Sequence, residues 1–102
     1  MVKVKELREL VTKLKGEKTL ETHTVEFVLD AKKYFASNVK AGTDTMTIEI
    51  TRDNYHPLTV DSLEQTLNIA GGDLEVNVLQ GKNGKTITEH FVTDSAVEFV
   101  LG

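Results

Sequence analysis

The stretch VEFVLD, residues 25–30, recurs as VEFVLG at residues 97–102. Both copies are rich in β-branched and aromatic residues, which favour β-strands. Alternate residues of a strand face opposite sides of a sheet, so the odd-numbered valine, phenylalanine and leucine of each copy would share one face. The residues that flank the two copies do not correspond. We therefore interpret the likeness as two strands of similar composition rather than as an internal duplication.

The segment that follows the first copy, residues 30–41, allows two interpretations. As a helix it would be capped by Asp30 and ended by Gly42. As a strand it would pair with the first copy through a three-residue turn that begins at Asp30, and Phe27 would lie opposite Phe35. A helix here would follow the strand without a loop, whereas such joints usually take about two residues or more. The hairpin is therefore favoured.

Hydrophobic periodicity predicts two helices. Apolar residues recur at spacings of three and four over residues 3–15, and Gly16 is placed to end this helix. A second helix is predicted over residues 59–72, with Thr59 or Asp61 as its N-cap. Its apolar positions also share one face, so both helices are expected to pack on a sheet.

The remaining strands are predicted from alternation and from one turn signal. Residues 43–52 alternate apolar and polar side chains, as a half-buried strand does. Two further strands, residues 73–80 and 86–93, flank Asn83-Gly84. This dipeptide is the strongest short-range hairpin signal in a sequence. We therefore expect these two strands to pair with each other.

That hairpin determines which side chains of its second strand would reach the core. Val76 would face Phe91, and Glu89 would be a charged misfit on the apolar side. His90 would lie on the opposite face. A three-residue turn after this strand would pair Phe91 with Phe99 and direct the apolar side chains of the last strand inward, whereas a two-residue turn at Asp94-Ser95 would direct them outward. Burial favours the three-residue turn.

The order of these elements predicts an α+β fold. It has an N-terminal helix, an antiparallel sheet of about five to six strands and a second helix mid-chain, in a loose αβββ-αβββ order. If residues 30–41 were helical, the order would become αβαβαβββ and the class would stay α+β. A length of 102 residues predicts one globular domain over residues 1–102.

Composition excludes several classes of site. The chain has no cysteine, so it cannot form a disulfide, a thiolate nucleophile or an iron–sulfur site. No apolar run approaches the roughly 20 residues of a membrane span, and residues 1–6 lack a secretory apolar region. We expect a cytoplasmic protein. The net charge of −4 makes nucleic acid an unlikely partner, although residues 1–18 alone carry a net +3.

No set of residues has the spacing of a catalytic, cofactor or metal site. His23, His56 and His90 form no close histidine pair, and no serine lies in a sharp glycine-flanked turn. The glycines and lysines of residues 81–85 match no phosphate-binding loop. We therefore assign no catalytic residue, no cofactor and no metal ligand. Three glutamates within apolar strands are interpreted as aids to solubility rather than as acid–base groups: Glu26, Glu89 and Glu98.

Two functional hypotheses remain. The first is a non-catalytic protein-interaction or assembly module of adaptor or inhibitor type that binds a protein partner or a second copy of itself, with a viral or mobile-element origin as one option. The alternative is a small enzyme or ligand-binding domain whose site forms at a dimer cleft from Glu89 and the histidines. For the first hypothesis, the expected contact residues lie on the first helix and the last strand: Val4, Leu7, Val11, Leu14, Val97, Phe99 and Leu101.

Overall fold

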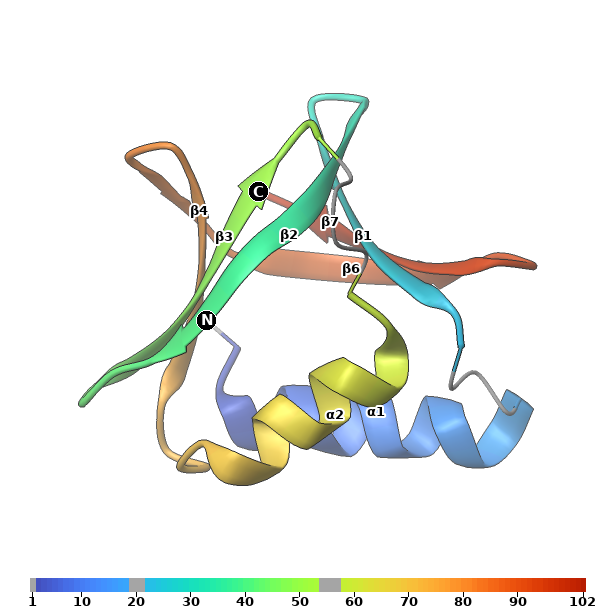
Figure 1. The fold of residues 1–102 in the computed structure, drawn as a ribbon, viewed down its shortest axis with the longest axis horizontal. Helices are drawn as coiled ribbons and strands as arrows, with labels where there is room; N and C mark the ends of the chain where they lie inside the picture. The colour runs from blue at the N-terminus through green and yellow to red at the C-terminus, as the bar shows by residue number, and fades with distance from the viewer. Residues whose placement is uncertain (1, 19–21, 54–57) are drawn as a thin grey trace.

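The computed structural model describes residues 2–18, 22–53 and 58–102, and its architecture is α+β (Figure 1). Two helices, α1 and α2, lie side by side beneath a curved sheet. The helices span Val4–Lys18 and Val60–Ile69. The strands are β1 (Thr24–Leu29), β2 (Lys32–Ala41), β3 (Thr45–Thr51), β4 (Glu75–Gln80), β5 (Asn83–Lys85), β6 (Ile87–Val92) and β7 (Ala96–Leu101).

Over the described residues the sheet has seven strands in the order β5-β4-β3-β2-β1-β7-β6, and it is mixed rather than antiparallel. β1 runs parallel to β7, and β3 runs parallel to β4. The expectation of an antiparallel sheet with five to six strands is therefore wrong in detail. The parallel pairing of β3 with β4 follows from α2. The helix carries the chain back to the end of the sheet at which β3 begins, so β4 runs in the same direction as β3.

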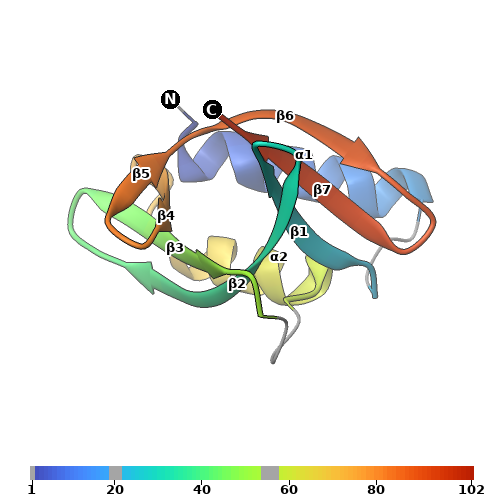
Figure 2. The ribbon, with the colours of Figure 1, turned by 90° about the horizontal axis from the view of Figure 1, so that it is seen from above.

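The sheet is so strongly curved that the strands at its two ends directly follow each other in the chain (Figure 2). The first and last strands in the sheet order, β5 and β6, are separated only by Thr86. Thr86 and Gly102 exchange backbone hydrogen bonds of 3.3 and 3.0 Å, which extends the β6–β7 ladder to this joint. One continuous segment, residues 83–92, therefore borders both β4 and β7.

The hydrophobic core fills the space between the concave face of the sheet and the two helices. The helix predicted over residues 3–15 is confirmed, although it continues through Gly16 to Lys18. The second helix is also confirmed and begins at its cap Thr59, whose Oγ1 accepts a hydrogen bond from Ser62 N at 3.2 Å. The apolar positions of both helices are buried as expected: Val4, Leu7, Val11, Leu14, Leu63, Leu67 and Ala70.

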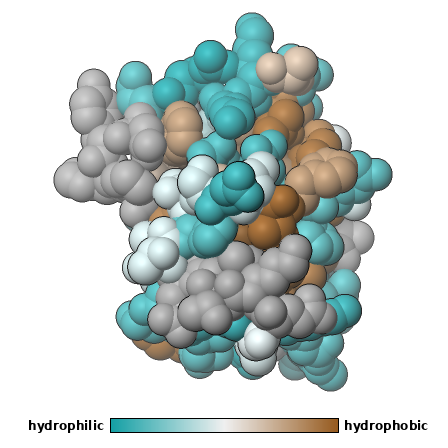
Figure 3. All heavy atoms as spheres, turned by 90° about the vertical axis from the view of Figure 1, so that its right-hand side faces the viewer, coloured by the Kyte–Doolittle hydropathy of each residue, from teal (hydrophilic) through white to brown (hydrophobic). Residues whose placement is uncertain are grey.

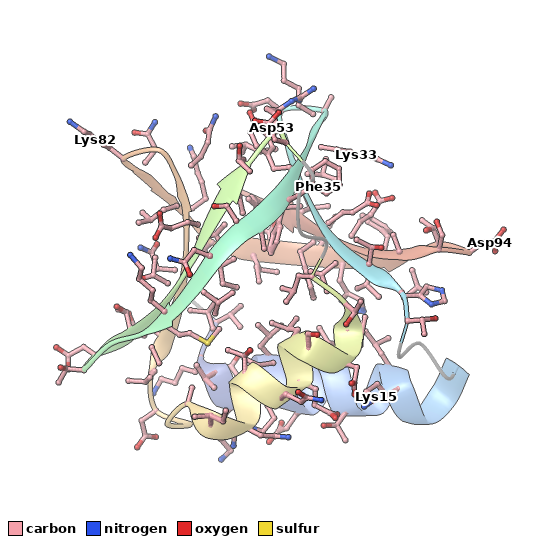
Figure 4. The ribbon with its side chains drawn as sticks, in the orientation of Figure 1. Lys15, Lys33, Phe35, Asp53, Lys82 and Asp94 are labelled. Atoms are coloured by element: carbon pink, nitrogen blue, oxygen red, sulfur yellow. The ribbon has the colours of Figure 1, made fainter. Side chains whose placement is uncertain are left out.

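Charged side chains of α1 join the two helices at both ends of α2. Arg8 donates three hydrogen bonds to the backbone oxygens of Leu67 and Ala70, where α2 ends. Lys15 lies 3.0 Å from Asp61 and 2.8 Å from Glu64, in the first turns of α2 (Figure 4). Its hydrogen bond to Glu64, and then that to Asp61, raise the pKa of Lys15 above its usual value. The helices therefore run antiparallel, with each end of α2 matched to a cation from α1.

Residues 32–41 form a strand, so the helical alternative for this segment is wrong and the hairpin is confirmed. Its turn has two residues rather than three, because Leu29 pairs with Lys32. Both turn residues, Asp30 and Ala31, have positive φ angles of 52° and 62°. A two-residue turn of this kind fits the right-handed twist of the flanking strands.

The shorter turn moves every pair by one residue and so exchanges the two faces of β2. Phe27 lies opposite Tyr34, not Phe35. Tyr34 and Ala36 therefore point into the core, whereas Phe35 lies on the outer, convex face and is half-buried.

The hairpin expected at Asn83-Gly84 is wrong. The turn lies at Gly81 and Lys82, with Gly81 at φ 62°, and β4 pairs with β5 over only three residue pairs. Gly84 is a strand residue on which an added Cβ would lie 3.0 Å from Asn77 Oδ1. A glycine at this position is therefore explained by close approach to β4 and not by a turn.

The strand expected over residues 86–93 pairs antiparallel with β7 as expected, but within the described residues it does not pair with β4. Phe91 lies opposite Glu98, not Phe99, so its predicted burial is wrong, and it is 54% exposed. Glu89 is exposed and opposite Val100, and His90 lies opposite Phe99.

The turn before β7 has two residues, Asp94 and Ser95, rather than three, because Thr93 N donates to Ala96 O at 2.8 Å and Val92 lies opposite Val97. The shorter turn moves each pair by one residue and so turns Phe91 to the outer face. The inward direction predicted for the apolar side chains of β7 is confirmed.

The turn at Ala31 yields a test of the β1–β2 hairpin. An alanine in the left-handed region destabilises the folded state by about 1–2 kcal/mol, and glycine avoids this cost. Glycine also raises the conformational entropy of the unfolded chain, but its effect on the free energy of unfolding is smaller. We expect Ala31→Gly to raise the free energy of unfolding in urea by about 0.5–1 kcal/mol. Ala41→Gly, at a strand end, is the control and should lower it. A loss of stability in Ala31→Gly would contradict this turn.

Arg8 yields a test of the contact between the helices. Arg8→Met removes three hydrogen bonds from a cation to the end of α2. We expect it to lower the free energy of unfolding by about 2 kcal/mol, whereas Lys13→Ala, on the exposed side of α1, should change it by less than about 0.5 kcal/mol. Equal effects of the two variants would show that Arg8 does not hold the helices together.

Candidate interaction surface

The two copies of the repeated pentapeptide lie side by side in the sheet. β1 and β7 pair in parallel and in register, so Val25 lies beside Val97 and Phe27 beside Phe99. The two phenylalanine rings are tilted in the core with their centroids 5.9 Å apart. Identical residues therefore occupy both positions of every rung that the repeats share, on the outer face as well as in the core.

On the outer face this register places two carboxylates next to each other. Glu26 and Glu98 are partners across β1 and β7, and their side chains are only 15% and 20% exposed. Like charges on directly opposite residues destabilise a sheet. Lys33 offsets the repulsion, since its Nζ lies 3.3 Å from Glu26 Oε1 and 3.9 Å from Glu98 Oε2. Glu26 Oε1 is buried and has no hydrogen-bond partner among the described residues, so the ion pair with Lys33 is its polar contact there.

Two aromatic side chains flank the carboxylates on the same rung. Phe35 of β2 lies opposite Glu26, and Phe91 of β6 lies opposite Glu98. Lys33 and Phe35 project from β2 near its start (Figure 4). The neighbouring rung runs from Lys33 across two valines to Glu89. We call the two rungs together the outer-face patch: Glu26, Val28, Lys33, Phe35, Glu89, Phe91, Glu98 and Val100.

Apolar side chains are visible on the side of the molecule that carries this patch. Figure 3 shows brown and tan atoms gathered in an interrupted band between hydrophilic groups. The largest exposed contribution from the patch is Phe91. The patch therefore combines four apolar and four charged side chains on one face of the sheet.

The seven contact residues expected from the sequence are all in the core. Each is at most 7% exposed, because the side chains of α1 and β7 face each other across the interior of one chain. A contact between two copies through these residues would require the core to open: Val4, Leu7, Val11, Leu14, Val97, Phe99 and Leu101.

The two histidines in the described residues, His23 and His90, are not brought together. His23 is half-buried just before β1, His90 is exposed on β6, and His56 lies outside the described residues. In residues 2–18, 22–53 and 58–102 no group of three histidine or carboxylate side chains could hold a metal ion. No pocket is found in the same ranges.

Sequence reasoning missed the outer-face patch, although a signal for it was present. Glu26 and Glu98 occupy the second position of each copy of the repeat. Identical strands can be aligned in parallel and in register, and that alignment alone pairs the two carboxylates. Phe35 and Phe91 could not have been found in this way, because their exposure depends on the lengths of the β1–β2 and β6–β7 turns, each of which is one residue shorter than expected.

Comparisons with protein-family models, with curated proteins and with solved structures find no match for this chain. In the part of the chain that the structure describes, neither helix is both long enough and apolar enough to cross a bilayer.

The carboxylate pair yields a test of the sheet register. We expect Lys33→Met to lower the free energy of unfolding by about 0.5–1 kcal/mol, because it leaves two neighbouring carboxylates without their cation. In a Glu98→Gln background the same change should cost less than half as much. Lys32→Met is the control, and chemical denaturation of the four variants is the measurement. An equal loss in both backgrounds would contradict the in-register pairing of β1 and β7.

Proposed function

We propose that this chain is a non-catalytic protein-interaction module, of adaptor, inhibitor or assembly type, whose partner binds at the outer-face patch. The observation that carries the proposal is Phe91, a large apolar side chain that is 54% exposed on the last strand of the sheet. Aromatic side chains of this kind are enriched among the residues that contribute most to protein–protein binding.

The surroundings of Phe91 support the same proposal. Its cross-strand neighbour Glu98 and the adjacent Glu26 form a partly desolvated acidic centre with one cation, Lys33. Phe35 and the two valines add apolar area on either side of this centre. A protein surface with complementary charge and a groove for the phenylalanine ring would bury both features together.

Affinity capture from the organism that encodes the chain tests this proposal. We expect proteins captured by the wild-type chain to be lost with Phe91→Ser. Ile69→Ser is the matched control, because Ile69 is also a large exposed apolar residue but lies at the end of α2. Proteins captured equally by all three forms, or by none of them, would contradict a partner-binding role for this surface.

A further inference from the structure

The edge of the sheet next to the outer-face patch is open. Among the described residues β6 is last in the sheet order and pairs with β7 alone. Near the other end of the sheet, the part of β4 that extends beyond its pairing with β5 is covered, because Val76 N donates to Val2 O at 2.8 Å and Lys3 bridges to Glu75. No such cover is present on β6 within the described residues. The β6–β7 hairpin also projects away from the rest of the molecule, with Asp94 at its tip (Figures 1 and 4).

The backbone groups at this edge can be assigned from the ladder. Successive residues of an antiparallel strand direct their N–H and C=O groups alternately to the two sides. Thr93 N donates to Ala96 O at 2.8 Å, which continues the β7 ladder. Phe91 therefore also bonds toward β7, and His90 and Val92 direct their N–H and C=O groups to the open side. These groups would bond an added strand.

The side chains beside this edge are apolar and acidic. On the outer face, Phe91 and Glu89 are two residues apart on the edge strand, and Glu98 lies behind Phe91 on β7. Glu26 and Asp94 are further acids near them, and Lys33 is the cation of the patch. A strand added to β6 would thus meet one aromatic ring and a net negative charge.

We propose that the partner supplies an extended segment that adds to β6 as an antiparallel strand, with an apolar residue followed two positions later by lysine or arginine. This inference rests on the proposed function. In that register the apolar residue faces Phe91 at a non-hydrogen-bonded pair, where side chains approach most closely. The basic residue faces Glu89, and opposite charges at such positions stabilise pairing. Main-chain hydrogen bonds supply affinity, and the two side chains supply specificity.

The charges favour such a partner over a second copy of the chain. A second copy would bring its own β6, with its acidic Glu89 and Glu98, against those of the first. Like charges brought together across an interface oppose association. A basic segment gains from the same field, and its gain should fall as salt is added.

The test uses a terminally blocked heptapeptide of threonines with valine at the third position and lysine at the fifth. Its titration into the full chain is followed by amide NMR shifts at low ionic strength. We expect shifts concentrated on residues 89–92, and binding at least about threefold tighter than for the same peptide with glutamate in place of lysine. A version that is N-methylated along its bonding edge should not bind, because it cannot form the ladder.

Two variants make the result specific to this edge. Glu89→Lys should reverse the preference, so that the glutamate peptide binds more tightly than the lysine peptide. His90→Pro should abolish binding of both while leaving the β7 ladder intact, because the His90 N–H faces the open side. The fold of each variant is checked from its unperturbed amide signals, and Glu89→Lys decides the outcome if the proline variant does not fold.

Equal affinity for the two peptides in both backgrounds would overturn the proposal, as would shifts centred on another strand. Dimerisation of the chain through β6, seen by sedimentation together with protected His90 and Val92 amides, would also overturn it in favour of a second copy. The result of the capture experiment with Phe91→Ser does not depend on these outcomes. Partners that are lost with Phe91→Ser despite equal peptide affinities would retain the interaction module and reject strand addition.

Discussion

The parallel pairing of β1 with β7 is the contact on which the rest of the structure depends. It joins the first strand of the described chain to the last, and it connects the β6–β7 hairpin to the central strands β1, β2 and β3. On the inner face it brings Phe27 and Phe99 together in the core. On the outer face the same register forces Glu26 against Glu98. The register that packs the two phenylalanine rings therefore also places the two carboxylates together, and Lys33 lies where it offsets their repulsion.

The helices close the curved sheet from below, and their own contact depends on charge at both ends of α2. Backbone oxygens at the end of a helix carry partial negative charge, and Arg8 meets them directly. The acidic residues at the start of α2 suit its positive end, and Lys15 binds them in turn. The antiparallel arrangement therefore follows from complementary charges as well as from the apolar stripes, which would permit either direction.

The parts of β4 and β6 that have no neighbouring strand differ in their cover. The first described residues cover β4 where it extends beyond β5, whereas no described segment covers the outer side of β6 beside Phe91. An open edge is a risk for uncontrolled pairing between copies, and proteins limit that risk with charged residues and bulges. β6 has both, since Glu89 lies on the edge strand and the register shifts beside it. The acids that discourage self-pairing are the same groups that would select a basic segment.

Interactions between residues close in the chain were determined by the sequence alone. The apolar spacing of residues 3–15 and 59–72 identified both helices, and alternation identified the strands and the inward face of β7. The α+β class followed from these elements. Turn lengths were less certain, because adding or removing one residue exchanges the faces of a strand, as it did for Phe35 and Phe91.

Only the tertiary structure decided which strands are neighbours and which side chains form the outer-face patch. The strand over residues 86–93 was expected between β4 and β7, but in the described residues only its pairing with β7 is present. The likeness of residues 25–29 and 97–101 did not by itself show that these strands pair. Pairing between distant strands depends on the combined burial of the whole sheet and on the closure of long loops. No short stretch of sequence contains that free energy, because every strand here could pair acceptably with several others.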